Sequence, residues 1–490
     1  MADTALVRFH TDLRVHDNGA LARTVDADRV LPVYCFDPRE FEQSEYGPAK
    51  TGPYRARFLR ESVRDLRESL RDLGGDLAVR HGEPESVIPD LAAEHGADRV
   101  CFETKPATEE YAVEGALVDA LGERGIAAER TWGKTLYHIE DLPTGVDEID
   151  DTFTPWREEI EREATVRDTR PMPDAIRTPD VEPGEIPTLA DLGIEASDGD
   201  GASDAGDPDG IGEPDDRAVL DFRGGETAGL ARLEEYVWER DRLREYKETR
   251  NGLLGADYSS KFSPWLALGC LSPRRVHQVV ERYERERVAN DSTYWLVFEL
   301  FWRDYMTFQF EKHGGAFFTP TGIRDVHKDW RRDEQGFGRW AAGETGVPFV
   351  DANMRELNAT GYMSNRGRQN VASFLADVLR IDWRLGAAHF EAKLLDYDVC
   401  SNWGNWAYQA GVGNDSRDDY FDVLSQGERY DPDGEYVRHW LPELGGLPAE
   451  AAREPWRLTE DQQAAYGVVL GEDYPEPMVD VERAYGRLRG

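Results

Sequence analysis

The first third of the chain alternates short apolar runs with longer amphipathic stretches, and this alternation restricts the folds open to it. The apolar runs have the length of buried strands, and each is followed by a stretch with helical periodicity. Such an order predicts a doubly wound α/β domain, in which helices cover both faces of a parallel sheet. The expected strands are Ala5–Phe9, Val30–Phe36, Leu77–Arg80 and Arg99–Phe102, and the expected helices are Asn18–Thr24, Tyr54–Leu73, Pro84–Glu94 and Glu109–Arg124.

Sheets of this kind bind ligands at the carboxyl ends of their strands. We therefore expect the segments Phe9–Asn18, Phe36–Phe41 and Glu103–Thr108 to form the mouth of a site. No glycine-rich phosphate-binding sequence follows the first strand, so the pattern predicts neither a dinucleotide-binding nor a P-loop module.

The rest of the chain is different. From Glu226 onward apolar residues recur with helical spacing almost everywhere, and Pro and Gly stand at the joins, which predicts an all-α second domain. We place the domains at residues 1–135 and 221–490, with a linker at 136–220. The expected helices are Glu226–Arg244, Pro273–Arg285, Thr293–Phe310, Asn353–Leu357, Gln369–Arg380 and Leu385–Asp396.

The linker is acidic. Between about Pro171 and Arg217 the composition turns to Asp, Glu, Gly, Pro and Ser, which is typical of a solvated, flexible segment. An acidic mimic of nucleic acid is the alternative, and the internal position and glycine breaks of the run disfavour it.

The net charge of the chain bears on two further possibilities, cation binding and adaptation to concentrated salt. With 58 Lys and Arg against 97 Asp and Glu, the net charge is -39. This surface either binds cations or is adapted to concentrated salt, and the even spread of the acids favours a halophilic microbe as the source. It also argues against indiscriminate affinity for nucleic acid, but leaves room for a local basic groove.

The four cysteines are far apart and lack the spacing of metal ligands, so we expect neither a disulfide framework nor a bound metal. The N-terminal segment carries charge from its first residues, and no apolar run reaches membrane-spanning length. We expect a soluble, cytoplasmic protein that does not contact membranes.

Three serines and a lysine precede an apolar helix in the segment from Tyr258 to Pro273. Hydroxyls and free backbone N–H groups at a helix start suit a diphosphate. Simple N-capping by Ser263, with Pro264 in the first helical position, explains the same residues and is preferable for this motif taken alone.

Two other segments combine polar and aromatic groups. In the helix expected from Tyr294 to Phe310, Glu299 lies in one stripe with Trp295 and Trp302; such a stripe is usually core, but a buried acid must be paired or functional. The segment NRGRQN, Asn365 to Asn370, fits either a solvated loop or an anionic or heteroaromatic ligand.

The segment DYDVCSNWGNWAYQ, Asp396 to Gln409, carries acids, amides and aromatic rings and almost no aliphatic residues. If its second half is helical, Asp398, Asn402 and Trp406 share one face. This row could hold a planar, nitrogen-rich heterocycle and deliver an electron to it through the indole.

Together with ELFWRDY and YSSKFSPWLALGCLSP, these segments resemble the flavin domain of the photolyase and cryptochrome family. The likeness covers nearly the whole chain apart from the acidic linker. Within the family the chain is most similar to the cryptochrome-DASH branch, on the evidence of HTDLRVHDN, VYCFDPREF, WGKTLYHIEDLP, Gln369 and Tyr408.

The resemblance implies FAD as the cofactor, folded so that its adenine lies beside the isoalloxazine. Asn402 would face flavin N5, where a neutral amide allows full reduction, and Arg368 would pair with Asp396. The FAD phosphates would be held by Tyr246, Ser259, Ser260, Lys261 and Ser263, and the pocket would be walled by Glu299, Arg303, Arg366, Arg368, Asp396, Asp398 and Asn402.

The family's electron relay corresponds to Trp406, Trp383 and Trp330, through which light would reduce the flavin. The alternative is that these indoles are packing residues, although Trp330, in HKDWRRD, has the sequence context of a surface residue.

The substrate implied is DNA that contains cyclobutane pyrimidine dimers, preferably single-stranded, because flipping a base out of a duplex costs more. Trp302 and Tyr408 would flank the flipped dimer, with Glu299 and Asn365 bonded to its base edges and Gln369 beside it. The candidates for phosphate contact are Arg250, Arg303 and Arg366.

The N-terminal domain would bind an antenna pigment, methenyltetrahydrofolate, through Glu103 or, as a second choice, Glu110; helix capping is the alternative role for both acids. The first hypothesis is therefore a monomeric deoxyribodipyrimidine photolyase that repairs dimers with electrons from FADH⁻. The second is a blue-light receptor with weak or no repair. A flavin oxidoreductase that uses nicotinamide is a third, and the missing dinucleotide fingerprint disfavours it.

Overall fold

The computed structural model describes residues 3–194, 215–414 and 420–489. Its N-terminal part is a five-stranded sheet in the order β3-β2-β1-β4-β5, and every neighbouring pair is parallel. The predicted doubly wound α/β domain is therefore confirmed. The strands are β1 (Thr4–Phe9), β2 (Arg29–Phe36), β3 (Ala78–His81), β4 (Arg99–Glu103) and β5 (Ala127–Thr131).

The fifth strand, with the sequence AAERT, was not predicted. Its residues are exposed or half-buried at the sheet edge, so it lacks the apolar run that marks the other four. It is defined by its pairing with β4, in register from Arg99 opposite Ala127 to Glu103 opposite Thr131.

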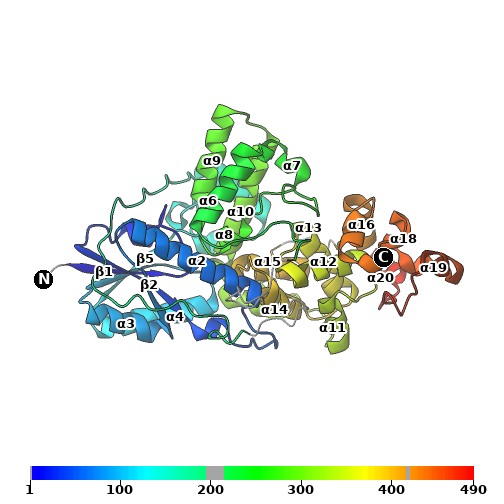
Figure 1. Cartoon of the computed structure of the whole chain (residues 1–490), viewed down its shortest axis with the longest axis horizontal. Helices are drawn as coiled ribbons and strands as arrows, with labels where there is room; N and C mark the ends of the chain where they lie inside the picture. Colours follow the sequence, from blue (N-terminus) through cyan, green and yellow to red (C-terminus); the bar gives the residue numbers. More distant parts are fainter. Residues whose placement is uncertain (1–2, 195–214, 415–419, 490) are drawn as a thin grey trace.

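Helices cover both faces of the sheet (Figure 1). Helix α2 packs on one face, where Val7 and Tyr34 meet Phe58 and Leu66. Helices α3 and α4 pack on the other face, against alternate residues of the same strands. The helices of this part are α1 (Gly19–Ala22), α2 (Pro53–Asp72), α3 (Pro84–Glu94), α4 (Thr108–Glu123) and α5 (Phe153–Glu163).

The second part is helical, as predicted. Helix α10 begins with a reciprocal capping box between Asn290 and Thr293 and extends to His313, beyond its predicted end. The helices are α6 (Glu226–Glu234), α7 (Tyr246–Thr249), α8 (Ser263–Ala267), α9 (Pro273–Glu286), α10 (Asp291–His313), α11 (Glu334–Ala342), α12 (Pro348–Thr360), α13 (Asn365–Ser373), α14 (Trp383–Lys393), α15 (Val399–Gln409), α16 (Val423–Tyr430), α17 (Glu435–Trp440), α18 (Ala449–Arg453), α19 (Glu460–Tyr466) and α20 (Val481–Leu488).

Two predicted helices end earlier than expected. After Glu234 and after Ser373 the chain widens into single π-helical turns, Glu235–Glu239 and Phe374–Val378. The segment NRGRQN, for which a solvated loop was one interpretation, is the first part of α13. Among the described residues no helix is both long and apolar enough to cross a membrane.

The segment Phe9–Asn18, expected at the mouth of a site, is covered by the helical part of the chain. That segment docks on the helical part: the Leu13 amide donates to the Leu268 carbonyl over 3.2 Å. Asp17 forms a buried ion pair with Arg274 at 2.9 Å. Because these contacts cover the sheet edge, the candidate site lies beyond it, among the helices.

The segment predicted as a solvated linker is ordered in its first part. The Ile176 amide donates to the Leu73 carbonyl over 2.9 Å, and the Val79 amide donates to the Pro183 carbonyl over 2.7 Å. The side chains of Ile176 and Leu192 are buried. Apolar residues dispersed among acids and prolines therefore seat residues 171–194 on the N-terminal domain. Residues 195–214, the most acidic stretch, lie outside the described part.

Candidate functional site

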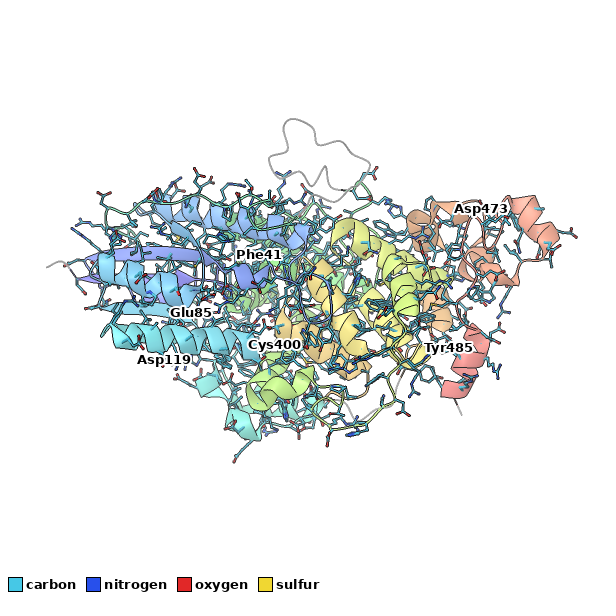
Figure 2. The ribbon with its side chains drawn as sticks, turned by 90° about the horizontal axis from the view of Figure 1, so that it is seen from below. Phe41, Glu85, Asp119, Cys400, Asp473 and Tyr485 are labelled. Atoms are coloured by element: carbon cyan, nitrogen blue, oxygen red, sulfur yellow. The ribbon has the colours of Figure 1, made fainter. Side chains whose placement is uncertain are left out.

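Helix α15 runs through the centre of the molecule and packs against α10, α13 and α14. Figure 2 labels Cys400 near its start, between the N-terminal domain and the C-terminal helices. Asp398 is the N-cap of α15, so the predicted helical row of Asp398, Asn402 and Trp406 is confirmed. The polar and aromatic segments singled out in the sequence thus converge on one helix and its neighbours.

Arg368 and Asp396 form the predicted ion pair. Both carboxylate oxygens of Asp396 accept from one guanidinium nitrogen, at 2.8 and 3.0 Å. The carboxylate is buried, whereas the guanidinium keeps a quarter of its surface exposed. Arg368 also donates to the Met363 carbonyl at 3.0 Å, so its orientation is set from both ends. The pair therefore holds one positive and one negative charge in fixed positions beside the candidate site.

Asn402 is buried on the same face of α15. Its amide nitrogen donates to the Ala387 carbonyl of α14 at 3.0 Å. This bond uses one of the two N–H donors and fixes the orientation of the amide. The carbonyl oxygen Oδ1 and the second N–H are left for a ligand.

Lys261 lies in the loop before α8. Its side chain is buried, and Nζ has no hydrogen-bond partner among the described residues. Burial lowers its pKa well below the usual range. An anion at this position would satisfy the ammonium and restore its charge. A buried lysine without a hydrogen-bond partner suits a diphosphate-binding loop, so these residues fit the phosphates of FAD.

The serines near Lys261 differ in exposure. Ser260 is buried, Ser259 is half-buried and Ser263 is exposed. Ser263 is inside α8, Phe262 is the N-cap, and no side chain caps the helix, so simple N-capping by Ser263 is wrong. Its hydroxyl remains available for a ligand. Tyr246, at the start of α7, is buried, and burial raises its pKa.

Asp398 and Arg303 both face the N-terminal domain. Asp398 forms a buried ion pair with Lys134. Burial raises the pKa of Asp398, but Lys134 and Arg303 lower it more, so that it falls well below its usual range. Arg303 donates to the Lys134 carbonyl and, at 2.9 Å, to the Leu266 carbonyl. These internal bonds favour a positioning role for Arg303 over its predicted phosphate contact.

The three relay tryptophans differ in burial. Trp406 and Trp383 are buried, and Trp330 is half-buried. Trp406 packs against Phe390, with ring centroids 5.1 Å apart. The segment of Trp330 is joined to the start of α14 by a parallel bridge between Arg331 and Ile381. The row therefore leads from the interior toward the surface.

The substrate-side residues lie along α10 and α15. The rings of Trp302 and Tyr408 meet edge to face, with centroids 6.2 Å apart. Glu299, one turn before Trp302, forms an ion pair with Arg250. Asn365, at the start of α13, is exposed. The structure thus brings the aromatic groups of two separate motifs together, with an acid one turn away on α10.

Phe153 is a residue of this site that the sequence did not indicate. It begins α5 and stacks on Trp302, with ring centroids 3.6 Å apart and planes at 6°. One face of Trp302 is therefore covered, and Tyr305 and Tyr408 also meet this ring edge to face. No local motif surrounds Phe153, so only its packing reveals it.

Arg366 and Gln369 project from α13. Arg366 donates to Asn251 at 3.0 Å and lies over the Tyr430 ring, 4.7 Å from its centroid. The Gln369 carbonyl oxygen is buried and has no hydrogen-bond partner in the described part of the chain. Nearby, residues from Arg242 to Tyr258, with Arg429 and Tyr430, line a hollow of about 690 Å³.

The two antenna candidates occupy different environments. Glu103 is buried and pairs with Lys105 at 2.6 Å. Burial raises the pKa of Glu103, but Lys105 and Arg14 lower it more. Glu110 is half-buried, and its pKa is raised by burial despite His10 and Lys134. Glu103 therefore has its counter-charge within the protein, whereas no described cation pairs directly with Glu110.

Comparisons with known proteins agree with this geometry. The family model described as "FAD binding domain of DNA photolyase" matches residues 295–489, and the model "DNA photolyase" matches residues 5–176. Together they cover both parts of the fold. A parallel-sheet domain joined to a helical FAD-binding domain defines the photolyase and cryptochrome class.

Full-length relatives specify the branch. The chain is 63% identical to "Cryptochrome DASH" of Natronomonas pharaonis, covering 99% of this chain and 100% of the relative. It is 49% identical to the protein of the same name from Synechocystis sp., with coverage of 98% and 96%. The chain belongs to the photolyase/cryptochrome family, in the branch of the proteins named cryptochrome DASH.

Solved structures show the same relationship. The crystal structure of the Synechocystis cryptochrome matches with a TM-score of 0.93 at 48% identity, over 99% of this chain and 98% of that one. A bacterial class III photolyase from Agrobacterium tumefaciens matches with a TM-score of 0.83 at 30% identity, over 100% and 98%. Photolyases and cryptochromes therefore share this architecture with the chain.

Proposed function

We propose that the protein is a light-driven photolyase, which splits cyclobutane pyrimidine dimers and acts preferentially on single-stranded DNA. The observation that carries this proposal is that α15 bears both Asn402 and Tyr408, with the Tyr408 ring meeting Trp302 edge to face and the Arg368–Asp396 pair just before the helix. We further propose that it acts as a monomer in the cytoplasm. When bound, fully reduced FAD supplies an electron to the dimer under light and recovers it after the ring has opened.

The residues present fit FAD. Lys261 and the free hydroxyl of Ser263 suit its phosphates, since a buried lysine without a hydrogen-bond partner favours an anion. The Arg368–Asp396 pair and the acceptor oxygen of Asn402 would orient the polar edge of the isoalloxazine. Asn402 adds no charge, so it does not oppose formation of the fully reduced anion.

Trp302 and Tyr408 would hold the flipped dimer. Phe153 fixes the plane of Trp302, so this ring is preorganised before DNA binds. Stacking of a base on an aromatic ring contributes about 1–3 kcal/mol. Tyr408 and Gln369 make the pocket more polar than two apolar residues would. Flipping the dimer out of the strand costs less in single-stranded DNA than in a duplex.

Arg250 and Glu299 would change partners when DNA binds. In this structure the Arg250 guanidinium is paired with the Glu299 carboxylate. A phosphate of the lesion strand would compete for Arg250, because Arg binds phosphate through charged hydrogen bonds. Glu299 would then be released to accept from the base edge, and Asn365 at the start of α13 is exposed and would be a second group for it. Binding of the DNA backbone would thus be coupled to recognition of the base.

Photoreduction would use Trp406, Trp383 and Trp330. Electron transfer weakens steeply with distance, so hops between rings reach a buried flavin where one long step would not. Trp406 is buried and Trp330 is half-buried, which supports electron flow from Trp330 inward to the flavin.

For the antenna we propose methenyltetrahydrofolate with Glu110 as its first contact. The geometry reverses the order of the two candidates, because Glu103 is already neutralised by Lys105. Glu110, in the first turn of α4, interacts electrostatically with Tyr397 and Cys400 of the helical domain.

The test uses purified, chemically reduced protein, illuminated with dimer-containing single-stranded and duplex oligonucleotides. Restored pyrimidines are counted, and samples kept in the dark are the control. We expect restoration on the single strand and less on the duplex. No restoration on either substrate would refute the photolyase proposal and favour the receptor, which needs flavin photoreduction but no lesion chemistry.

A further inference from the structure

Helix α12 carries a buried acid that no part of the proposed chemistry uses. Glu356 is fully buried, and its Oε1 atom has no hydrogen-bond partner among the described residues. An ionised carboxylate with a buried, unpaired oxygen is costly, whereas a neutral carboxyl group is much less so. Burial accordingly raises the pKa of Glu356 from 4.5 to about 8.

The hydrogen bonds around Tyr436, in α17, also require this acid to hold a proton. The Tyr436 oxygen lies 3.0 Å from Asn353 Oδ1 and 2.6 Å from Glu356 Oε2. Asn353 Oδ1 can only accept, because the amide nitrogen donates to the Phe349 carbonyl at 2.6 Å. The phenol has one hydrogen, so an ionised Glu356 would leave one of the two buried oxygens without a donor. A protonated Glu356 donates to the Tyr436 oxygen and leaves the phenol to donate to Asn353.

Glu356 acts on the part of the site that suits the FAD phosphates. It interacts electrostatically with Lys261, whose buried Nζ has no hydrogen-bond partner in the described part of the chain. Arg368 also acts on Glu356, but that guanidinium is already paired with Asp396 at 2.8 Å. Lys261 is therefore the cation that an ionised Glu356 would neutralise. The titratable side chains that interact with Glu356 are Tyr258 and Lys261 before α8, Tyr362 before α13, Arg368 in α13 and Tyr436 in α17.

We propose that Glu356 is a further positioning residue of the FAD site, which must hold its proton for the diphosphate to bind beside Lys261. In the protonated form, the acid leaves Lys261 without a counter-charge from the protein, so the phosphates of FAD supply one. In the ionised form, the carboxylate would neutralise Lys261 itself and would add a negative charge near the diphosphate. Both effects oppose binding of an anion.

FAD binding and protonation of Glu356 therefore favour each other, because coupling between two binding events is reciprocal. As pH rises through about 8, the flavin-free protein loses the Glu356 proton, whereas the loaded protein retains it. Above this pH, binding must also take up one proton from water, so each pH unit should weaken binding by about tenfold through this group. This role rests on FAD as the cofactor but not on DNA repair.

Flavin release from the holoprotein tests the role of Glu356. Holoprotein is diluted in series between about pH 6 and 9 at one salt concentration, and ultrafiltration measures the free FAD, which gives the dissociation constant. The comparison is with Glu356→Gln, which is neutral at every pH and whose amide can donate to Tyr436 as the protonated acid does. We expect the ratio of the wild-type to the variant dissociation constant to be constant below about pH 7 and to rise by about tenfold by pH 9.

Tyr436→Phe is a second variant, in which the pH dependence should shift. Without the phenol the ionised carboxylate loses its hydrogen bond, so the pKa of Glu356 should rise further and FAD should be retained to higher pH than in the wild type. A purely structural role of Tyr436 would weaken flavin binding equally at every pH. That result would overturn the proposal.

Asp351→Asn is the matched control. Asp351 is also a buried acid of α12 with a pKa raised by burial, but it bonds to Thr345 and Tyr474. This variant should keep the wild-type pH dependence, and circular dichroism verifies that each variant is folded. A ratio that stays constant up to pH 9 in Glu356→Gln, or an equal change in Asp351→Asn, would refute the role of Glu356. Flavin retention is measured in the dark without DNA, so failure of repair is a separate outcome.

Discussion

Trp302 on α10 and Tyr408 on α15 meet edge to face, with ring planes at 86° and centroids 6.2 Å apart. Phe153 stacks on Trp302 from a third element. Three segments distant in the chain thus build one aromatic wall beside Glu299. In the proposed function this wall receives the flipped dimer.

Replacing Trp302 tests that wall. Trp302→Leu should weaken binding of a dimer-containing single strand by about 1–3 kcal/mol, since one stacking surface is lost. Fluorescence anisotropy measures the affinity. Trp456→Leu, at a half-buried tryptophan in the C-terminal region, should bind as the wild type does. Equal losses in both variants would contradict a specific role for Trp302.

Asp396→Asn should reduce flavin retention and stability. The Arg368 guanidinium would lose its counter-charge, and we expect unfolding to become easier by about 2 kcal/mol, a moderate value because Arg368 is partly exposed. Urea unfolding and flavin absorbance measure the two effects. Asp221→Asn breaks an exposed pair with Arg223 and should change stability by less than about 1 kcal/mol.

Asn402→Asp should leave more of the flavin short of full reduction under light, because a second negative charge opposes an anionic cofactor. Absorbance spectra during illumination follow the extent of reduction. Asn405→Asp is the control on the same helix, where the side chain is exposed. If both variants reduce as completely as the wild type, Asn402 does not act on the flavin.

Trp406→Phe should slow photoreduction strongly and keep the flavin bound, because a phenyl ring preserves packing against Phe390 but does not relay electrons. Repair by protein that was reduced chemically should be preserved, since it does not need the relay. Photoreduction at the wild-type rate would show that electrons reach the flavin by another route.

Glu356 should make stability depend on pH. It is buried, bonds to the Tyr436 hydroxyl at 2.6 Å, and burial raises its pKa from 4.5 to about 8. The folded state therefore holds the proton more tightly than the unfolded state, so stability falls as pH rises from about 4.5 to 8. Unfolding free energies should fall less steeply in Glu356→Gln, whereas exposed Glu344→Gln should keep the wild-type slope.

Local patterns predicted most elements correctly, because a helix or a buried strand repeats its apolar residues at a characteristic spacing. The failures have physical causes. β5 is a half-exposed edge strand and has no apolar run. Residues 171–194 have the composition of a flexible segment, yet a few buried side chains such as Ile176 and Leu192 seat them on the N-terminal domain.

The sequence likewise predicted only part of the chemistry of the site. The helical row through Asn402 follows from spacing, whereas the Arg368–Asp396 pair was implied by the family resemblance. The sequence could not show that Asp398 pairs with Lys134. Nor could it show that Glu103 already pairs with Lys105, whereas no described cation pairs directly with Glu110.

By itself, the sequence determined the parallel-sheet domain, the helical domain and the set of side chains suited to a flavin, since these depend on periodicity and residue chemistry. The tertiary structure decided which of those side chains are free and which are neutralised. It alone placed Phe153 on Trp302 and Tyr436 beside Glu356. Contacts between residues far apart in the chain arise from the packing of whole elements, and no local spacing encodes them.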